Sequence, residues 1–439
     1  MTLTFTPKNL RRAAVPEDSL EIGLKVLEMA RSGRFVEIRE MFAPQLRALV
    51  VPEVLEAAWV AEADRLGAVT LVGELTSEEP NAGVTAVRLP VTFERGELTF
   101  IVSVSESGWL VGLNLAPAGP TSVAEPWSAP SYSDVQKFDE HEVMVGSGSL
   151  SAPGTLSLPR NSLPGPGVVL LAGSGPSDRD ETIGTCKPLK DLAWGLASLG
   201  IAALRFDKVT YAHPREVSDN PNFTITDEYL NDAAAAVQVL RDQVNVDAER
   251  VFVLGHSLGG SVAPRVASLD PSLAGLVIMA GGTQPLQWAI VRQFQYLASL
   301  DPATQSASQA TIDVLSQQAR IVDDPVRLAS AQPSDLPFGV ASTYWMDLNA
   351  HQPALVARTV SMPMLILQGG RDYQATLAED FAGWKAGLEG KDNVTFQVFD
   401  DDNHCFFHGA GPSSPRDYEI LQHVDPAVVT VVAGWLNDH

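Results

Sequence analysis

Apolar residues recur at helical spacing between residues 20 and 66 of this 439-residue chain. The pattern then changes to short runs that predict strands at 69–75, 84–93, 98–104 and 109–115, with turns at 81–83 and 95–96. Helices followed by a meander indicate a small α+β domain, which we place at residues 1–118. The helical stripes are formed by Leu20, Leu24, Leu27 and Ala30, and by Val54, Leu55, Ala58 and Trp59.

A segment rich in Pro, Ser and Ala follows (APAGPTSVAEPWSAPSYSD, 116–134), and this is the composition of a linker. We place the linker at 119–134 and a second, larger domain at 135–439. Short continuous apolar runs alternate there with helical segments, as expected for parallel strands buried on both faces. The expected fold class is α/β, with a mostly parallel, doubly wound sheet. Its strands are predicted at 168–172, 202–206, 251–254, 276–279, 364–367 and 394–399, after an opening hairpin of 138–145 and 154–158, and helices are predicted at 188–198 and 229–243.

The interval between the fourth and fifth of these runs is too long for a simple crossover connection. It contains helical patterns at 286–300 and 310–320. Long insertions at the carboxyl edge of such a sheet usually form a lid or cap, and we predict a cap at about 283–360. Its aromatic side chains include Trp288, Tyr296, Tyr344 and Trp345.

The charge balance narrows the possible partners. With 30 Lys and Arg against 53 Asp and Glu, the formal net charge is −23. This disfavours nucleic acid and membrane surfaces, whose affinity depends on Lys and Arg. The two cysteines, Cys186 and Cys405, form no Cys-x-x-Cys metal motif. Because the N-terminus lacks the apolar core of a signal peptide and no run reaches membrane-span length, we expect a cytoplasmic protein.

The run VLLAGSGPSDRDETIG (169–184) ends a predicted strand in glycines, which brings backbone N–H groups close to an anion. It is not a P-loop, because no Lys followed by Ser or Thr comes after Gly175. It is not a dinucleotide fingerprint either, because Asp178 stands where the third glycine is needed. The anion is therefore expected to be something other than a nucleotide phosphate.

The sequence Gly255-His256-Ser257-Leu258-Gly259 lies between a predicted strand and a predicted helix. Gly-x-Ser-x-Gly in this place is the nucleophile elbow, a turn so sharp that the serine is strained and glycines are needed two residues to either side. We expect Ser257 to be a nucleophile.

A nucleophilic serine needs a base and an acid that orients the base, and in this architecture they follow in the order Ser, acid, His. The strand of MLILQGGRDYQ ends at Asp372, and the strand of VTFQVFDDDNHCFF is followed by His404. We therefore predict Ser257, Asp372 and His404 as a catalytic triad.

Other residues compete for these roles. The acids at 400–402 are too near His404 in sequence to reach its far nitrogen easily, and we interpret them as solvated. His408 is a candidate for lining the site, His423 is expected to be exposed, and His256 is expected to pack or to support the site.

The glycine loop is explained by this chemistry. Acyl transfer builds negative charge on a carbonyl oxygen, and two preorganised N–H donors stabilise that charge. We expect one donor to be the amide of Leu258. The other is expected at Ser174, with Gly175 as the alternative.

The motifs GSGPSDRDETIG, KPLKDLAWGLASLGIAALRFDK, GHSLGGSVAPRVA, LQGGRDYQ and DDNH together resemble a subgroup of bacterial α/β-hydrolase carboxylesterases, over most of 138–439. The N-terminal domain is similar to an uncharacterised module found ahead of such esterases. The resemblance implies the same triad. Two departures stand out: relatives commonly have His at the position of Ala172, where it supports the loop, and often Arg at the position of Val209.

We expect structural roles for most of the remaining residues of these motifs. We expect Arg205 and Asp207 to fix loops by ion pairing. The charged cluster at 178–181 either orders the oxyanion loop or shapes the entrance. Cys405 is expected to be a small packing residue, and Tyr373 to reach the pocket.

The expected function is hydrolysis of small to medium apolar esters, with no metal or cofactor. A small-molecule ester is the expected partner, and a homodimer is left open. The same residues would also serve a thioesterase, a peptidase or an acyltransferase. A binding or sensor protein with a vestigial hydrolase is the alternative from a different class.

Overall fold

The computed structural model describes residues 17–43, 47, 50, 52–77, 84–105, 107–117, 125–160, 163–300 and 305–439. The chain divides into two compact units, Met1–Pro120 with Ser306–Thr311, and Thr121–Gln305 with Ile312–His439. The turn predicted at 81–83 and residues 118–124 of the predicted linker region lie outside the described residues. The domain limits at 118 and 134 stay predictions.

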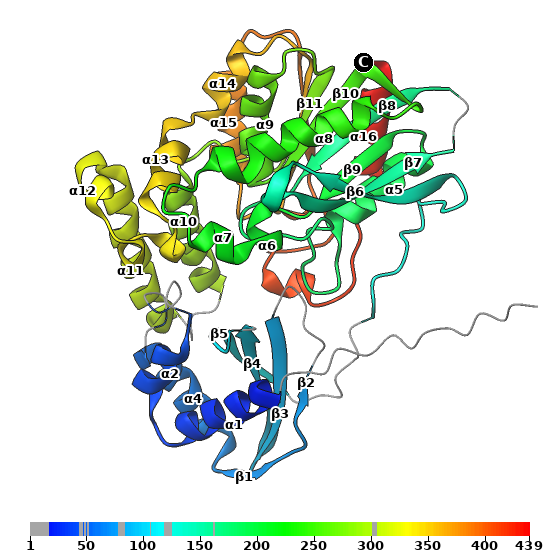
Figure 1. The fold of residues 1–439 in the computed structure, drawn as a ribbon. Coiled ribbons are helices and arrows are strands. Elements are labelled where there is room, and N and C mark those ends of the chain that lie inside the picture. The colour runs from blue at the N-terminus through cyan, green and yellow to red at the C-terminus, as the bar shows by residue number, and fades with distance from the viewer. Residues whose placement is uncertain are drawn as a thin grey trace, which may run out of the picture. The chain divides into compact units, whose positions relative to one another are not determined.

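The smaller unit combines helices with an antiparallel sheet (Figure 1). Alternate residues of the long third strand are buried, so one face of the sheet packs against the helices. The strand predicted at 69–75 is wrong in part: its pairing shifts register between residues 69 and 71, the strand ends at residue 72, and residues 73–75 belong to no strand. The elements are α1 (Glu17–Arg31), α2 (Phe35–Met41), α4 (Pro52–Leu66), β1 (Val69–Val72), β2 (Thr76–Ser77), β3 (Val84–Phe93), β4 (Gly96–Ser105) and β5 (Leu110–Pro117).

The larger unit is built on an 8-stranded sheet in the order β13-β12-β11-β10-β8-β9-β7-β6. Pairs from β9 to β13 are parallel, whereas β6, β7 and β9 pair antiparallel with one another in that order. The predicted fold class and opening hairpin are confirmed. The strands are β6 (Phe138–Val145), β7 (Ala152–Pro159), β8 (Gly165–Leu171), β9 (Ala202–Phe206), β10 (Val246–His256), β11 (Gly275–Met279), β12 (Met364–Gly369) and β13 (Val394–Phe399).

Helices cover both faces of this sheet (Figure 1). On one face, α5 (Pro188–Ser198) and α16 (Pro426–Asp438) share a core with the strands. On the other face lie α8 (Asn231–Arg241) and α9 (Leu258–Leu269). Residues 125–137 contain no helix or strand, and Trp127 packs on α5, with its ring centroid 4.9 Å from that of Trp194.

A helical segment connects β11 to β12, and the helix predicted at 286–300 is confirmed. Its helices are α10 (Leu286–Leu300), α11 (Gln305–Asp323), α12 (Pro325–Ser330), α13 (Ser342–Ala350) and α14 (Pro353–Thr359), and shorter helices elsewhere are α6 (Val209–Ala212), α7 (Pro214–Ser218) and α15 (Ala382–Gly387). None of the helices in the described ranges has both the length and the apolar character needed to cross a bilayer.

Candidate active site

Ser257 lies in the turn between β10 and α9, with φ 52° and ψ −120°. This left-handed backbone is rare for a residue with a Cβ. The flanking glycines are required by space: a Cβ on Gly255 would collide with the carbonyl oxygen of Gly259, and one on Gly259 would lie 2.6 Å from the carbonyl oxygen of Ala172. The turn holds a half-buried serine at the carboxyl end of a central strand.

Asp372 and His404 follow β12 and β13, and they are hydrogen-bonded, with Nδ1 of His404 2.7 Å from Oδ2 of Asp372. Both side chains are buried. The same Asp372 oxygen accepts from Gln368 Nε2 at 2.9 Å, and its Oδ1 accepts from the amides of Gln374 and Ala375. Because Nδ1 donates to the carboxylate, Nε2 of His404 is the nitrogen left to act as a base.

The structure therefore brings two of the three predicted residues into direct contact. Within the described part of the chain, the hydroxyl of Ser257 makes no hydrogen bond with His404. Such bonds are often long in unliganded enzymes and tighten when substrate binds. The ring of His404 lies beside that of His256, the residue before Ser257, with ring centroids 4.8 Å apart.

The rival acids do not reach the base. Asp400 and Asp401 are exposed, as expected. Asp402 is buried, which contradicts its interpretation as a solvated acid. Its carboxylate faces His408 rather than His404, because this loop turns back on itself before residue 408.

The loop after β8 approaches the elbow closely. A Cβ on Gly173 would lie 3.1 Å from Cβ and 3.6 Å from Oγ of Ser257. Neither the amide of Ser174 nor that of Leu258 donates a hydrogen bond to another described residue. Both N–H groups are thus available to an oxyanion, and that of Leu258 opens α9, whose positive dipole end favours negative charge.

Glu181 holds the start of this loop. Its Oε1 accepts from the amide of Gly173 at 2.6 Å and lies 2.9 Å from Nδ1 of His256. Glu181 is buried with φ 53°, so the backbone is strained to aim the carboxylate inward. Burial opposes its ionisation, but the charge and hydrogen bond of His256 together hold the pKa of Glu181 below its ordinary value. The cluster at 178–181 thus orders the loop.

The carbonyl of Gly173 is held as well. It accepts from Nζ of Lys208 at 2.8 Å and from the hydroxyl of Tyr229 at 2.7 Å. Lys208 is fully buried, and its Nζ pairs with Glu228 at 2.8 Å. Burial lowers the pKa of Lys208, and Glu228 opposes that shift. Side chains from outside the loop thus hold both the amide and the carbonyl of Gly173, next to Ala172.

The two predicted ion-pairing residues behave as expected. Arg205 pairs with Asp180 at 2.8 Å, and Asp207 pairs with Arg179 at 3.0 Å. These contacts join β9 to the acidic cluster and fix the remainder of the loop. Cys405 is buried, which is consistent with packing, and burial raises the pKa of its thiol well above the ordinary value.

A cavity of about 440 Å³ lies elsewhere in the larger unit. Glu216, Phe223 and Asp232 help to line it, and no member of the predicted triad does. It is therefore a separate hollow from the candidate site.

A model of the alpha/beta hydrolase family matches residues 168–418, which include Ser257, Asp372 and His404. The chain belongs to the alpha/beta hydrolase family. A curated relative of this hydrolase, esterase EstD of Thermotoga maritima, is 36% identical over 344 residues, 78% of this chain and 77% of that protein.

Solved structures are more distant from this hydrolase. Est1E from Butyrivibrio proteoclasticus has a TM-score of 0.43 at 16% identity, over 68% of this chain and 96% of its own. The 2,6-dihydroxy-pseudo-oxynicotine hydrolase has a TM-score of 0.41 at 19% identity, over 69% of this chain and 67% of its own.

The structure corrects the expectation for His423 and extends that for Tyr373. His423 of this hydrolase is not an ordinary exposed residue, because its Nδ1 lies 3.1 Å from the buried carboxylate of Asp191. Tyr373 stacks on Tyr296 of α10, with centroids 4.9 Å apart. The segment between β11 and β12 therefore packs directly beside the residue that follows Asp372. Sequence reasoning missed Tyr229, which stands in none of the quoted motifs, and Gln368, which stands in LQGGRDYQ but was given no role.

Proposed function

We propose that this chain is a serine carboxylesterase that hydrolyses small to medium carboxylic esters through an acyl-enzyme intermediate. The observation that carries the proposal is the buried hydrogen bond between His404 and Asp372, at the same sheet edge as the strained Ser257. The curated relative named as an esterase supports ester hydrolysis as the reaction.

In the proposed reaction, Oγ of Ser257 attacks the ester carbonyl carbon while Nε2 of His404 takes its proton. The carbonyl oxygen becomes an oxyanion, held by the amides of Ser174 and Leu258. The intermediate then collapses, and His404 returns the proton to the departing alcohol. Water deprotonated by His404 releases the acid and restores Ser257. Asp372 keeps its charge and stabilises the imidazolium of His404.

The proposed cap is the helical segment between β11 and β12, about residues 283–360. Its contact with the site is supported by the stacking of Tyr296 on Tyr373. Arg292 of the same helix pairs with the buried Asp380 at 2.7 Å, which anchors α10 to the residues that follow Asp372. The aromatic pair Tyr296 and Tyr373 beside Asp372 favours apolar acyl or aryl groups.

A cytoplasmic location remains part of the proposal, which cell fractionation would test. The homodimer stays open, and light scattering would decide it. The domain limits at 118 and 134 are likewise proposals.

The proposal is tested with p-nitrophenyl esters from acetate to decanoate. Ser257→Ala should abolish turnover, whereas the control Ser268→Ala, an exposed serine on the same helix α9, should retain it. A fluorophosphonate probe should label the wild type and not Ser257→Ala. Folded protein with no turnover at any chain length, yet labelled at Ser257, would redirect the proposal to thioesters, peptides or acyl transfer. Absence of labelling would reject a serine hydrolase.

A further inference from the structure

Asp402 is an anomaly in the loop that carries His404. Its side chain is 1% exposed. Its Oδ2 is buried without a hydrogen-bond partner in the described structure. Burying a carboxylate is costly unless positive charge or hydrogen bonds compensate it. A cation bound beside the Asp402 carboxylate would compensate this cost.

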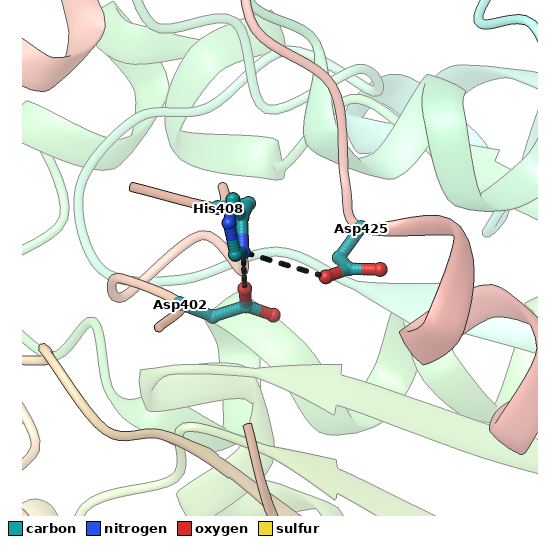
Figure 2. A group of neighbouring side chains, drawn as sticks. All are labelled: Asp402, His408 and Asp425. Atoms are coloured by element: carbon teal, nitrogen blue, oxygen red, sulfur yellow. Dashed lines mark ion pairs between the residues drawn. The ribbon is translucent and has the colours of Figure 1, made fainter. Parts of the chain in front are cut away.

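Two further ligand-type side chains face it (Figure 2). Nδ1 of His408 lies 3.7 Å from Oδ1 of Asp402 and 3.9 Å from Oδ2 of Asp425. These separations are longer than hydrogen bonds. One nitrogen and one oxygen from each acid all lie within 4.8 Å of one another. The three side chains therefore surround a common point without closing on it.

The backbone holds the three residues in this arrangement. Asp402 and His408 form an antiparallel bridge, and Phe407 bridges to Val424 in the same way. The amide of Asp425 donates to the carbonyl of Phe406 at 2.9 Å. The three side chains thus come from backbone segments that are already hydrogen-bonded to one another. Little further ordering of the backbone is needed for a ligand to bind.

The uncoordinated side-chain atoms of this cluster are of the types that bind divalent transition-metal ions. Oδ1 of Asp425 caps α16 by accepting from the amide of Ala427 at 2.6 Å, which leaves Oδ2 facing His408. Two carboxylate oxygens and one imidazole nitrogen suit zinc and similar divalent transition ions, which bind such atoms at about 2.0–2.2 Å. Two ligand atoms on one such ion are at most ~4.4 Å apart. Both distances from His408 already satisfy this limit.

We propose that Asp402, His408 and Asp425 form a binding site for one divalent transition-metal ion of the zinc class. The His408 side chain is 67% exposed, so solvent supplies the remaining ligands. The ion would join the loop around His404 to the start of α16. It takes no part in the chemistry proposed for Ser257, and the inference does not depend on that proposal.

The test is calorimetric titration of metal-free, untagged protein with Zn²⁺, together with metal analysis after desalting. The wild type should bind one equivalent at this site, and its Tm should rise with Zn²⁺. His408→Ala and Asp402→Asn should weaken this binding by more than ~10-fold and lose the Tm response. His408→Ala removes an exposed side chain, so its folding is not in question.

The matched controls are His141→Ala and Asp401→Asn, an exposed histidine and an exposed acid outside the cluster. Both should bind Zn²⁺ as the wild type does. Absence of binding to the wild type would overturn the site. Equal binding by His408→Ala would also overturn it and would indicate adventitious surface binding only. Because no readout uses ester turnover, an inactive protein would leave the result intact.

Discussion

His256 lies between Glu181 and the backbone of His404, with Nδ1 2.9 Å from the Glu181 carboxylate and Nε2 2.9 Å from the carbonyl oxygen of His404. A carboxylate and a carbonyl oxygen both accept hydrogen bonds, so this geometry favours the imidazolium form, in which both ring nitrogens donate. Burial opposes this charge, but Glu181 raises the pKa of His256 above its ordinary value. Since Glu181 also binds the amide of Gly173, one ion pair connects the glycine loop to the proposed base.

The first prediction concerns this connection. His256→Gln should lower kcat about 10- to 100-fold with little change in KM, because it moves His404 without removing a group that touches substrate. Glu181 would be left buried and unpaired, a change that costs about 3–5 kcal/mol. The double variant Glu181→Gln/His256→Gln avoids that charge and should fold more stably than His256→Gln alone. Unchanged kcat in the folded double variant would contradict a positioning role.

The second prediction is a pH dependence of stability. The pKa of His256 is raised above 6.5, so its contribution is complete below pH 6.5 and is lost as pH rises through the folded-state value. The pKa of Glu181 is lowered below 4.5, so its contribution is complete above pH 4.5 and is lost as pH falls through the folded-state value.

The pair therefore contributes most between pH 4.5 and 6.5. Urea unfolding at about pH 5.5 and about pH 9 should show that the free energy of unfolding of the wild type, relative to Glu181→Gln/His256→Gln, is larger at the lower pH. An equal difference at both values would mean that the pair is not charged in the folded protein.

The third prediction concerns Gly173. A Cβ there would lie 2.8 Å from Oε1 of Glu181 and 3.1 Å from Cβ of Ser257, so the loop must shift. Gly173→Ala should lower kcat by about 10²–10³, the usual effect of losing one oxyanion donor. Gly434→Ala in α16 meets no atom within 4 Å and should leave kcat unchanged. Steady-state kinetics on one p-nitrophenyl ester compares the two variants.

The fourth prediction concerns Lys208. Lys208→Met removes the buried partner of Glu228 and one of the donors to Gly173, so the free energy of unfolding should fall by about 3–5 kcal/mol. Tyr229→Phe removes the hydroxyl that donates to Gly173 and accepts from Lys208, and should cost about 2 kcal/mol. Urea denaturation measures both. Equal losses would show that the ion pair with Glu228 adds nothing beyond the two hydrogen bonds of the Tyr229 hydroxyl.

The fifth prediction concerns the thiols. Cys186 and Cys405 are both buried and unpaired, and burial raises the pKa of each thiol. A thiol-reactive chromogenic reagent should therefore label neither in the native protein and both in denaturant. Rapid native labelling of Cys405 would show that the loop around His404 opens.

The sequence by itself determined the sheet, the elbow and the order of the proposed triad. Parallel strands buried on both faces need continuous apolar runs, and the turn at Ser257 needs glycines at 255 and 259 because a Cβ at either would meet backbone. These requirements are local, so they leave a visible pattern in the chain. The ends of β1 in the smaller unit were harder to predict, because a register shift interrupts its pairing with β3.

Only the tertiary structure decided which polar residues meet. Glu181 and His256 are far apart in the chain, as are Lys208 and Gly173, and no spacing rule joins them. In the sequence, Asp402 is one of three consecutive acids in a predicted loop. The fold buries it near Asp425, which stands at the start of the last helix. Burial and partnership depend on how separate segments pack. The pattern of polar residues along the chain therefore does not predict which of them will be buried and which will stay exposed to water.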